Sequence, residues 1–200
     1  MSDGLAEGPD GKLRCWWGAS TPDYVAYHDE EWGRPITDDR GIYERLTLEA
    51  FQSGLSWLTI LRKRENFRAA FDGFDFERVA GYGDRDFKRL MDDAGIVRNR
   101  AKIAAAIANA QATLELAEAG ESLAALAWLF RADADPPTGL EDLAATTDAS
   151  KALAKELKRR GFRFVGPTTA YALMQACGLV NDHLYGCRVR ADVERARRAG

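Results

Sequence analysis

The sequence predicts an all-α fold, and three features carry that prediction. After about residue 13 the chain falls into short runs with helical spacing, separated by Gly and Pro signals. No run of strand length alternates apolar and polar residues, which predicts little sheet. Apolar residues make up 46% of the 200 positions and charged residues 30%, as is typical of one packed domain.

The first expected helices have recognisable start and stop signals. Thr21 and Pro22 supply an N-cap and a first helical residue, and the run that follows ends at Gly33. Further helices are expected at about 37–53, 57–71 and 84–94.

The second half of the chain continues the same pattern. Asn99 is expected to cap a long Ala-rich helix that reaches about Ala119, and a short apolar helix follows at 122–130. Residues 133–139 read as a loop. Asp148 is expected to cap a basic helix to Arg160, and a last helix spans about 167–177. These elements predict a flexible leader at 1–12, one helical domain at 13–188 and a charged, frayed tail at 189–200.

Charge and composition exclude several classes of protein. The net charge of −3 excludes a uniformly basic nucleic-acid coat protein, although a local basic face remains possible. No apolar stretch approaches the roughly 18–20 residues of a membrane span, so no membrane partner is expected. The N-terminal residues are acidic and Gly-rich, unlike a signal peptide. The odd count of 3 cysteines indicates reduced thiols and a cytoplasmic protein.

Both histidines of the chain lie near a cysteine. Cys15 precedes His28 by 13 residues, and His183 and Cys187 form a close pair. Two thiolates and two imidazoles suit tetrahedral zinc, and a closed four-ligand set favours a structural role. Alternatively, the four are unrelated core or surface residues. The tight spacing of a zinc finger is absent, so the spacing alone leaves both interpretations open. Cys177, at a helix end, is expected to be a buried apolar residue.

A carboxylate is expected on an apolar helix face. On the helix at 37–53, Glu49 points between Ile42 and Leu46. Burying a lone carboxylate is costly, so the alternatives are a Glu that reaches solvent or pairs with an Arg. Aromatic residues cluster in the same part of the chain: Trp16, Trp17, Tyr24, Tyr27, Trp32 and Trp57. They are either plain core or flat faces that, with an acid, suit a planar cationic ring such as a nucleobase.

Residues 149–177 read as a helix, a short turn and a second helix. The turn is 161–166, and Pro167 opens the helix after it, where free backbone N–H groups can bind a phosphate oxygen. Basic residues crowd the first helix and the turn: Lys151, Lys155, Lys158, Arg159, Arg160 and Arg163. A charge run is usually a solvated face, but its position beside this turn favours phosphate binding.

Six ordered blocks between Arg14 and Cys187 carry a resemblance to a known family. They are CWWG at 15–18, YVAYHDEEWG at 24–33, LEAFQSGLSW at 48–57, KRENFR at 63–68, DAGI at 93–96, and RGFRFVG at 160–166 continuing through MQACGLVNDH at 174–183. In these blocks the chain resembles the DNA-3-methyladenine glycosylase I family, which belongs to the helix-hairpin-helix DNA glycosylase superfamily.

The resemblance implies a fold, a cofactor and a set of site residues. The fold would be helix-hairpin-helix glycosylase-like, with the hairpin unit at about 149–177. One structural zinc ion per chain would be held by Cys15, His28, His183 and Cys187. The base pocket would use Glu49, the catalytic residue, and Tyr27 as hydrogen-bonding groups and Trp57 as a stacking surface, with Trp17, Tyr24 and Trp32 lining it. DNA would contact Gly54, Leu55, Gly161, Gly166, Thr168 and Thr169.

The resemblance also implies an activity. The enzyme would hydrolyse the N-glycosidic bond of 3-methyladenine in alkylated double-stranded DNA, release the free base and leave an abasic site. We expect a monomer, and no lyase activity, because the sequence places no lysine as a Schiff-base nucleophile. The alternatives are a non-catalytic zinc-containing module that binds damaged DNA, a zinc hydrolase, and a glycosylase for a related lesion such as 3-methylguanine.

One position bears on the mechanism. Many glycosylases of the superfamily place a catalytic Asp in a Val-Asp-x-His context, and here the stretch is Val180-Asn181-Asp182-His183. If the His residues are aligned, Asn181 occupies the Asp position. Asn cannot act as a carboxylate base, which suits a leaving group that methylation has already made cationic.

Overall fold

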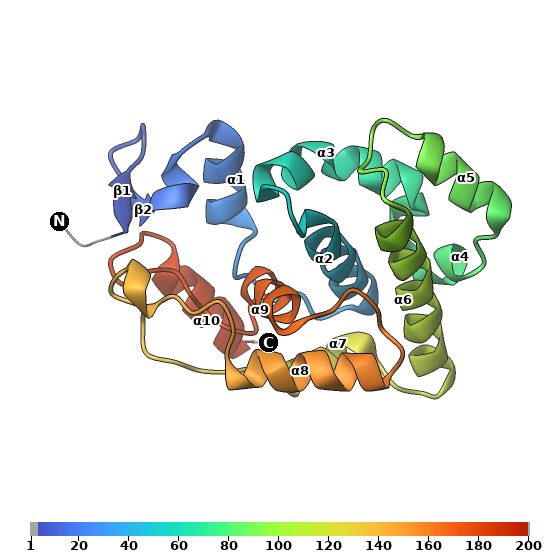
Figure 1. Ribbon diagram of the computed structural model, residues 1–200. Coiled ribbons are helices and arrows are strands. Elements are labelled where there is room, and N and C mark those ends of the chain that lie inside the picture. The colour runs from blue at the N-terminus through green and yellow to red at the C-terminus, as the bar shows by residue number, and fades with distance from the viewer. Residues whose placement is uncertain (1–3, 200) are drawn as a thin grey trace.

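Helices make up most of the computed structural model, which describes residues 4–199 (Figure 1). They are α1 (Pro22–Glu30), α2 (Asp39–Gln52), α3 (Trp57–Ala70), α4 (Phe76–Ala80), α5 (Asp84–Asp92), α6 (Arg100–Glu118), α7 (Leu123–Trp128), α8 (Asp148–Arg159), α9 (Pro167–Ala176) and α10 (Arg190–Ala199). Over the described residues the only sheet is an antiparallel pair, β1 (Leu5–Glu7) with β2 (Leu13–Cys15), in which Leu5 lies opposite Cys15. The predicted all-α fold is therefore confirmed.

Helix α2 lies at the centre of the molecule. It packs against α3, α6, α7 and α9, so it is enclosed on most sides (Figure 1). Its apolar side chains Ile42, Leu46 and Phe51 are completely buried. Burial of such side chains provides most of the driving force for packing, at about 1.5–3 kcal/mol for each. Because this packing fixes α2, any other side chain on its apolar face also has a fixed position.

Most expected helix starts are correct. The Thr21 side chain accepts a hydrogen bond from the Tyr24 N–H, and Asn99 accepts from the N–H groups of Ala101 and Lys102. The expected cap of α8 was wrong by one residue, because Thr147 caps the helix and Asp148 is its first residue. There the Asp148 carboxylate still faces the positive end of the helix dipole.

The N-terminal segment differs from the expected leader. Strand β1 lies in residues 1–12 and pairs with β2, with a turn in which the Gly8 N–H donates to the Lys12 carbonyl. The first three residues of that leader lie outside the described part of the chain. The short helix α4 was also not expected, since five residues are too few to show helical periodicity.

The C-terminal segment differs more strongly, because the expected frayed tail forms α10. Val193 is completely buried, and the Arg197 side chain is only 2% exposed. The Arg197 guanidinium donates to the carbonyls of Gly178, Leu179 and Ala132 and pairs with two acids. A charged side chain of this segment, that of Arg197, thus makes buried contacts within the protein instead of facing solvent.

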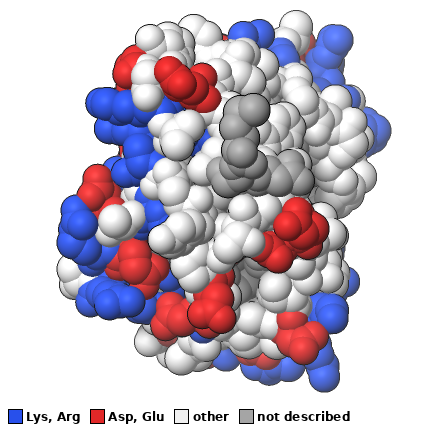
Figure 2. Space-filling model, turned by 90° about the vertical axis from the view of Figure 1, so that its left-hand side faces the viewer, with Lys and Arg blue, Asp and Glu red and all other residues white. Residues whose placement is uncertain are grey.

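The face that carries the N-terminus has mixed charge. Basic and acidic side chains are interspersed on it (Figure 2). On α10, Arg195 pairs with Asp192 and Arg198 pairs with Glu194. Within residues 4–199, no helix has the length and apolar character that crossing a membrane requires.

We expect Arg197→Ala to lower the free energy of unfolding by about 3 kcal/mol, because it leaves several buried carbonyls and acids without their donor. Arg198→Ala, whose side chain is 74% exposed, is the matched control and should change it by less than about 0.5 kcal/mol. Urea unfolding measures both. Equal small effects would mean that α10 does not stabilise the fold.

Candidate active site and metal cluster

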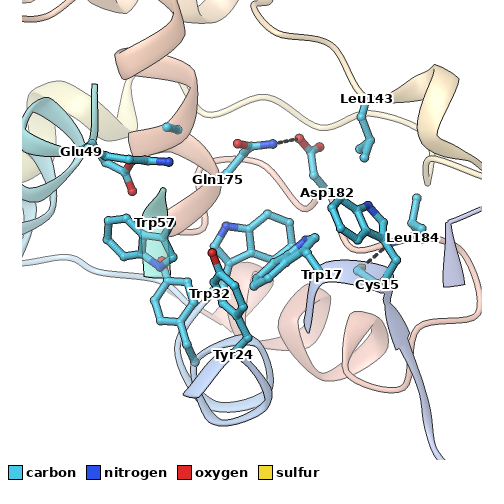
Figure 3. A pocket seen from close by; sticks show the side chains of 14 residues that line it. Cys15, Trp17, Tyr24, Trp32, Glu49, Trp57, Leu143, Gln175, Asp182 and Leu184 are labelled. Carbon is cyan, nitrogen blue, oxygen red and sulfur yellow. Dashed lines mark hydrogen bonds between the residues drawn. The ribbon is translucent and has the colours of Figure 1, made fainter. Parts of the chain in front are cut away.

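A cavity of about 270 Å³ opens beside α2 (Figure 3). It is lined by Cys15, Trp16, Trp17, Tyr24, Tyr27, Trp32, Glu49, Gln52, Trp57, Leu143, Ala172, Gln175, Asp182 and Leu184. The residues come from the N-terminal third, from the segment before α8 (Leu143), from α9 and from the segment after α9. The structure therefore brings together all six residues that the sequence analysis assigned to the base pocket.

Aromatic rings form one wall of this pocket. Trp17 meets Tyr24 and Trp32 edge to face, with ring centroids 5.4 and 5.0 Å apart. Tyr27 and Trp57 lie 5.2 Å apart in a tilted arrangement. The Tyr24 hydroxyl accepts a hydrogen bond from the Leu58 N–H at 3.0 Å, which joins α1 to the start of α3. These contacts fix flat apolar faces around the cavity.

Glu49 is buried in the pocket without a partner. It is 6% exposed, and no side chain or N–H group among residues 4–199 donates a hydrogen bond to its carboxyl. Burial raises the pKa of Glu49 to about 8, and the nearby positive charge of Arg45 offsets part of that rise. Near neutral pH the protonated form therefore predominates, and a cation placed beside the carboxyl would favour its ionised form.

Arg45 does not neutralise Glu49 because it is held elsewhere. Its guanidinium donates to Glu31 at 2.6 Å and lies over the Tyr27 ring, 5.5 Å from the centroid. Arg64 donates to the same Glu31 carboxylate at 2.6 and 2.8 Å. Neither alternative for Glu49, an exit to solvent or an Arg partner, is found in the structure.

Tyr27 also lines the pocket and carries a hydroxyl group. It is almost completely buried, and this burial raises the pKa of its hydroxyl far above the ordinary range. The hydroxyl therefore stays protonated and can both donate and accept a hydrogen bond.

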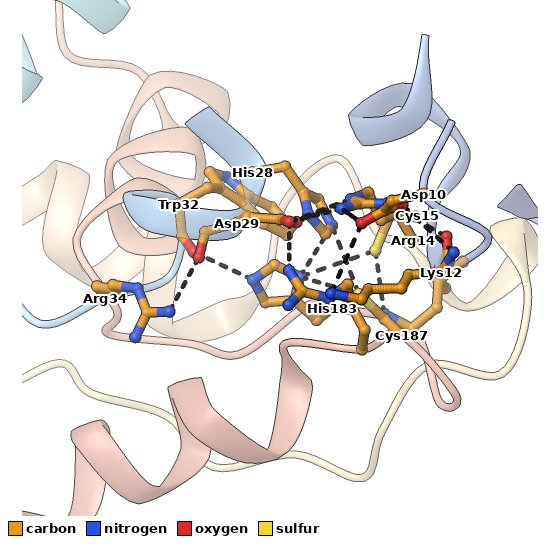
Figure 4. A network of polar contacts seen from close by, with 12 residues as sticks. Asp10, Lys12, Arg14, Cys15, His28, Asp29, Trp32, Arg34, His183 and Cys187 are labelled. Carbon is orange, nitrogen blue, oxygen red and sulfur yellow. Dashed lines mark hydrogen bonds and ion pairs between the residues drawn. The ribbon is translucent and has the colours of Figure 1, made fainter. Parts of the chain in front are cut away.

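A second cluster unites the two ends of the chain (Figure 4). One ligand atom from each of Cys15, His28, His183 and Cys187 lies within 4.8 Å of the others, and all four residues are buried. This cluster could hold a metal ion. The sequence had left open whether the four residues are unrelated or come together, and the structure shows that they come together. Two thiols and two imidazoles are the donor set that tetrahedral zinc takes in structural sites.

Neighbouring groups orient both imidazoles of the cluster. The Asp29 carboxylate lies 2.9 Å from His28 Nδ1, and the Trp32 carbonyl lies 3.0 Å from His183 Nε2. The opposite nitrogens, His28 Nε2 and His183 Nδ1, therefore face the Cys187 sulfur at 3.5 and 3.6 Å. Such outer partners fix the tautomer of a metal-bound histidine.

The cluster stands directly behind the pocket wall. The Trp17 ring meets His28 edge to face at 5.2 Å, and Trp32 meets His183 at 4.6 Å. Cys15 itself lines the pocket. Any change that loosens the cluster should therefore also loosen the aromatic wall.

A loop between α2 and α3 carries the two residues expected to form a wedge. Gly54 has a φ of +80°, which favours glycine, and the Leu55 side chain is 43% exposed. Lys102 of α6, which is 6% exposed, donates to the carbonyls of Phe51 and Ser53 at 2.8 and 2.6 Å and so fixes the start of this loop. The sequence analysis missed Lys102, because a lysine in a helix normally faces solvent.

The turn between α8 and α9 has a rigid backbone. The Asn109 side chain accepts from the Arg163 N–H at 2.7 Å and donates to the Arg163 carbonyl at 3.1 Å. Gly161 begins the turn with a φ of +91°, and Gly166 precedes α9. The N–H groups of Thr168 and Thr169 lie in the first turn of α9, where no intrahelical acceptor is available to them. The expected hairpin is present, and its groups are free to meet a phosphate.

The family model for methyladenine glycosylase matches residues 16–191. The chain belongs to the methyladenine glycosylase family. The match includes the whole pocket except Cys15, which precedes it by one residue.

Two curated relatives support the assignment of the chain to this family. DNA-3-methyladenine glycosylase 1 of Escherichia coli (strain K12) is 49% identical over 177 residues, which are 87% of this chain and 95% of the relative. DNA-3-methyladenine glycosylase of Haemophilus influenzae is 42% identical over 177 residues, 87% of this chain and 96% of the relative.

Solved structures agree with the fold. A crystal structure of 3-methyladenine DNA glycosylase I has a TM-score of 0.84 and 49% identity, over 88% of this chain and 98% of that one. A structure of 3-methyladenine DNA glycosylase I from Staphylococcus aureus, solved to explain how that protein recognises 3-methyladenine, has a TM-score of 0.82. It is 36% identical and covers 86% of this chain and 94% of that one.

We expect Glu49→Gln to remove a pH dependence of stability from the methyladenine glycosylase. The folded-state pKa of Glu49 lies near 8 against an ordinary 4.5, so the folded protein binds more protons than the unfolded chain in this interval. Wild-type stability should therefore fall as pH rises from about 4.5 to about 8. The variant should escape this loss and be more stable at pH 8 by on the order of 2–4 kcal/mol.

Urea unfolding at pH 5, 6, 7 and 8 measures this difference. Glu65→Gln, whose side chain is 78% exposed, is the matched control and should follow the wild type. A constant difference between Glu49→Gln and wild type across this range would contradict the burial argument.

Proposed function

We propose that this methyladenine glycosylase hydrolyses the N-glycosidic bond of 3-methyladenine in alkylated DNA, releasing the base and leaving an abasic site. The observation that carries the proposal is an unpaired, buried carboxyl, Glu49, in a pocket walled by aromatic rings. Methylation at N3 makes adenine cationic, so this ring would be the positively charged partner that Glu49 does not have in the free protein. The names of the curated relatives support the same activity.

Binding would begin at phosphates. The N–H groups of Thr168 and Thr169 would hold a phosphate oxygen of double-stranded DNA, with Gly161 and Gly166 shaping the turn. Leu55, presented by Gly54, would fill the gap that the extruded nucleotide leaves in the base stack. Extrusion costs a few kcal/mol, and a damaged base lowers that cost.

Recognition would then take place in the pocket. The cationic ring would stack on Trp57, with Trp17, Tyr24 and Trp32 completing the wall. Glu49 would accept hydrogen bonds from the adenine amino edge, and Tyr27 would hydrogen-bond beside it. The carboxyl ionises when the cation enters, which favours the lesion over neutral adenine.

Cleavage would require little acid catalysis. The methylated base leaves as a neutral molecule, so no proton needs to be donated to it, and water adds to the anomeric carbon. A lyase step would need an amine nucleophile, and among residues 4–199 no lysine lines the pocket. The enzyme is therefore a monofunctional glycosylase in this proposal.

The cofactor, assembly and compartment extend the proposal. One structural zinc ion would be held by the four residues of the metal cluster. Two thiolates and two imidazoles would fill all four coordination positions, so that no water could bind the metal. Zinc binding would therefore contribute to the free energy of folding and not to catalysis. The protein would act on duplex DNA as a monomer in the cytoplasm, and free 3-methyladenine would be its product.

Incubation of the protein with methylated DNA, followed by chromatography of the released bases, tests the activity. Wild-type protein should release 3-methyladenine. Glu49→Gln should slow release at least about 100-fold without loss of folding, because it removes the charge that the cation requires. Glu65→Gln serves again as the control. Binding to damaged DNA without release would instead indicate the non-catalytic module.

Elemental analysis tests the metal. We expect about one zinc per chain in protein purified without chelator. Cys187→Ser should lose the metal and several kcal/mol of stability, since metal binding is coupled to folding. Cys177→Ser is a matched control, because Cys177 is equally buried but lies outside the cluster and should keep the metal. Protein that folds normally and contains no zinc would refute the assignment.

A further inference from the structure

We propose that Gln175 is a specificity-determining residue, whose amide oxygen accepts a hydrogen bond from the exocyclic amino group of the base and so selects adenine lesions over guanine lesions. This inference rests on the proposed function. Gln175 lines the pocket from α9, and the proposed mechanism assigns it no role. The charge of the lesion cannot make this selection, because methylation at N3 makes guanine cationic as well as adenine.

A carboxylate fixes the orientation of the Gln175 amide. Gln175 Nε2 donates to Asp182 Oδ2 at 2.7 Å, and the Tyr171 hydroxyl donates to the same oxygen at 2.5 Å. A carboxylate only accepts hydrogen bonds, so an amide turned over would bring two acceptor oxygens into contact. The amide therefore keeps its N–H group on Asp182 and its oxygen on the opposite side.

The fold places Asp182 where it can hold this amide. Tyr171 and Gln175 are four residues apart on α9, so they present two donors side by side on one face of the helix. Asn181 turns the other way, because its Nδ2 donates to the Arg190 carbonyl at 3.2 Å, and it does not line the pocket. In this proposal Asp182 acts through Gln175 and is a positioning residue.

The fixed amide presents an acceptor to the pocket. In the part of the chain that the structure describes, no N–H or O–H group donates to Gln175 Oε1. This oxygen lies on the side of the amide that faces Glu49 (Figure 3). A cavity of about 270 Å³ suits one small planar ligand, so both side chains would meet the same ring.

Glu49 alone does not distinguish the two lesions. A protonated carboxyl can both donate and accept a hydrogen bond, and burial favours this form of Glu49 near neutral pH. Once ionised, it can accept from the N1–H group of guanine as well as from the amino group of adenine. An amide oxygen has no second form, since it accepts and never donates.

The two purines differ at the ring position that would meet the amide. Adenine has an amino group at C6 with two N–H donors, one for Glu49 and one for Gln175. Guanine has a carbonyl oxygen at C6, which would face Gln175 Oε1 with no hydrogen between the two acceptors. Leaving polar groups unpaired in a buried site is costly, so a site of this kind rejects the wrong analogue strongly.

Binding of free bases tests this selection without any cleavage. Tryptophan fluorescence gives the Kd of 3-methyladenine and of 3-methylguanine, and wild-type protein should bind 3-methyladenine at least about tenfold more tightly. Gln175→Leu should lower this ratio at least about fivefold, mainly by weakening 3-methyladenine binding. Gln111→Leu, which changes an exposed amide of α6, is the matched control and should keep the wild-type ratio.

Asp182→Asn provides a readout that damage to the fold would not produce. An Asn side chain both donates and accepts, so it would let the Gln175 amide turn over and donate to a guanine carbonyl. This variant should therefore bind 3-methylguanine at least about fivefold more tightly than wild type does. The double variant Asp182→Asn/Gln175→Leu should lose that gain, because Asp182 acts through Gln175.

Two results would overturn the inference. One is equal affinity of the wild-type protein for the two bases, which decides the matter even if a variant fails to fold. The other is a wild-type ratio that persists in Gln175→Leu. Failure of the wild type to release any base from methylated DNA is a different outcome, since it would contradict the proposed function and leave the binding ratio to decide this inference.

Discussion

The pocket depends on one buried carboxyl that the protein leaves unpaired. Burying an acid without a partner costs several kcal/mol, and the protein lowers that cost by keeping Glu49 protonated. The nearest cation, Arg45, is held by Glu31, which Arg64 also binds. The free energy that an ion pair at Glu49 would provide is therefore available only to a cationic ligand. Packing of α2 on most sides prevents the carboxyl from turning to solvent.

The cluster of Cys15, His28, His183 and Cys187 connects the pocket wall to both ends of the chain. Its residues come from both ends of the chain, and joining ends so far apart in sequence costs about 5 kcal/mol of chain entropy. Backbone pairing helps, since the Arg188 N–H donates to the Leu13 carbonyl at 2.9 Å. Because Trp17 and Trp32 pack directly on the two histidines, closure of the ends and the shape of the pocket are linked.

The sequence predicted those parts that follow from local rules. Helical phase placed Glu49 on the apolar face of α2, and cap residues located most helix starts. It could not show that Cys15 and His183 meet, because that contact is tertiary. The four candidate ligands were visible in the sequence, but only the family resemblance favoured a metal site over unrelated residues, and the roles of the pocket and DNA residues remain predictions.

Other features were missed for identifiable physical reasons. The internal contacts of Arg197 and Lys102 were not predicted, because basic residues in a helix normally face solvent, although their long side chains can also satisfy buried carbonyls. Asp182 lies in a segment without helical or strand periodicity, so no pattern could show which of it and Asn181 faces the pocket. Its acceptor contacts with Tyr171 and Gln175 reveal this only in three dimensions.

A carbon-13 NMR titration of the Glu49 side-chain carboxyl tests the central claim most directly. The burial argument predicts a pKa near 8 in the free protein and a clearly lower pKa when a permanently cationic methylated purine occupies the pocket. A pKa near the ordinary 4.5 in the free protein, unchanged by the cation, would contradict the account.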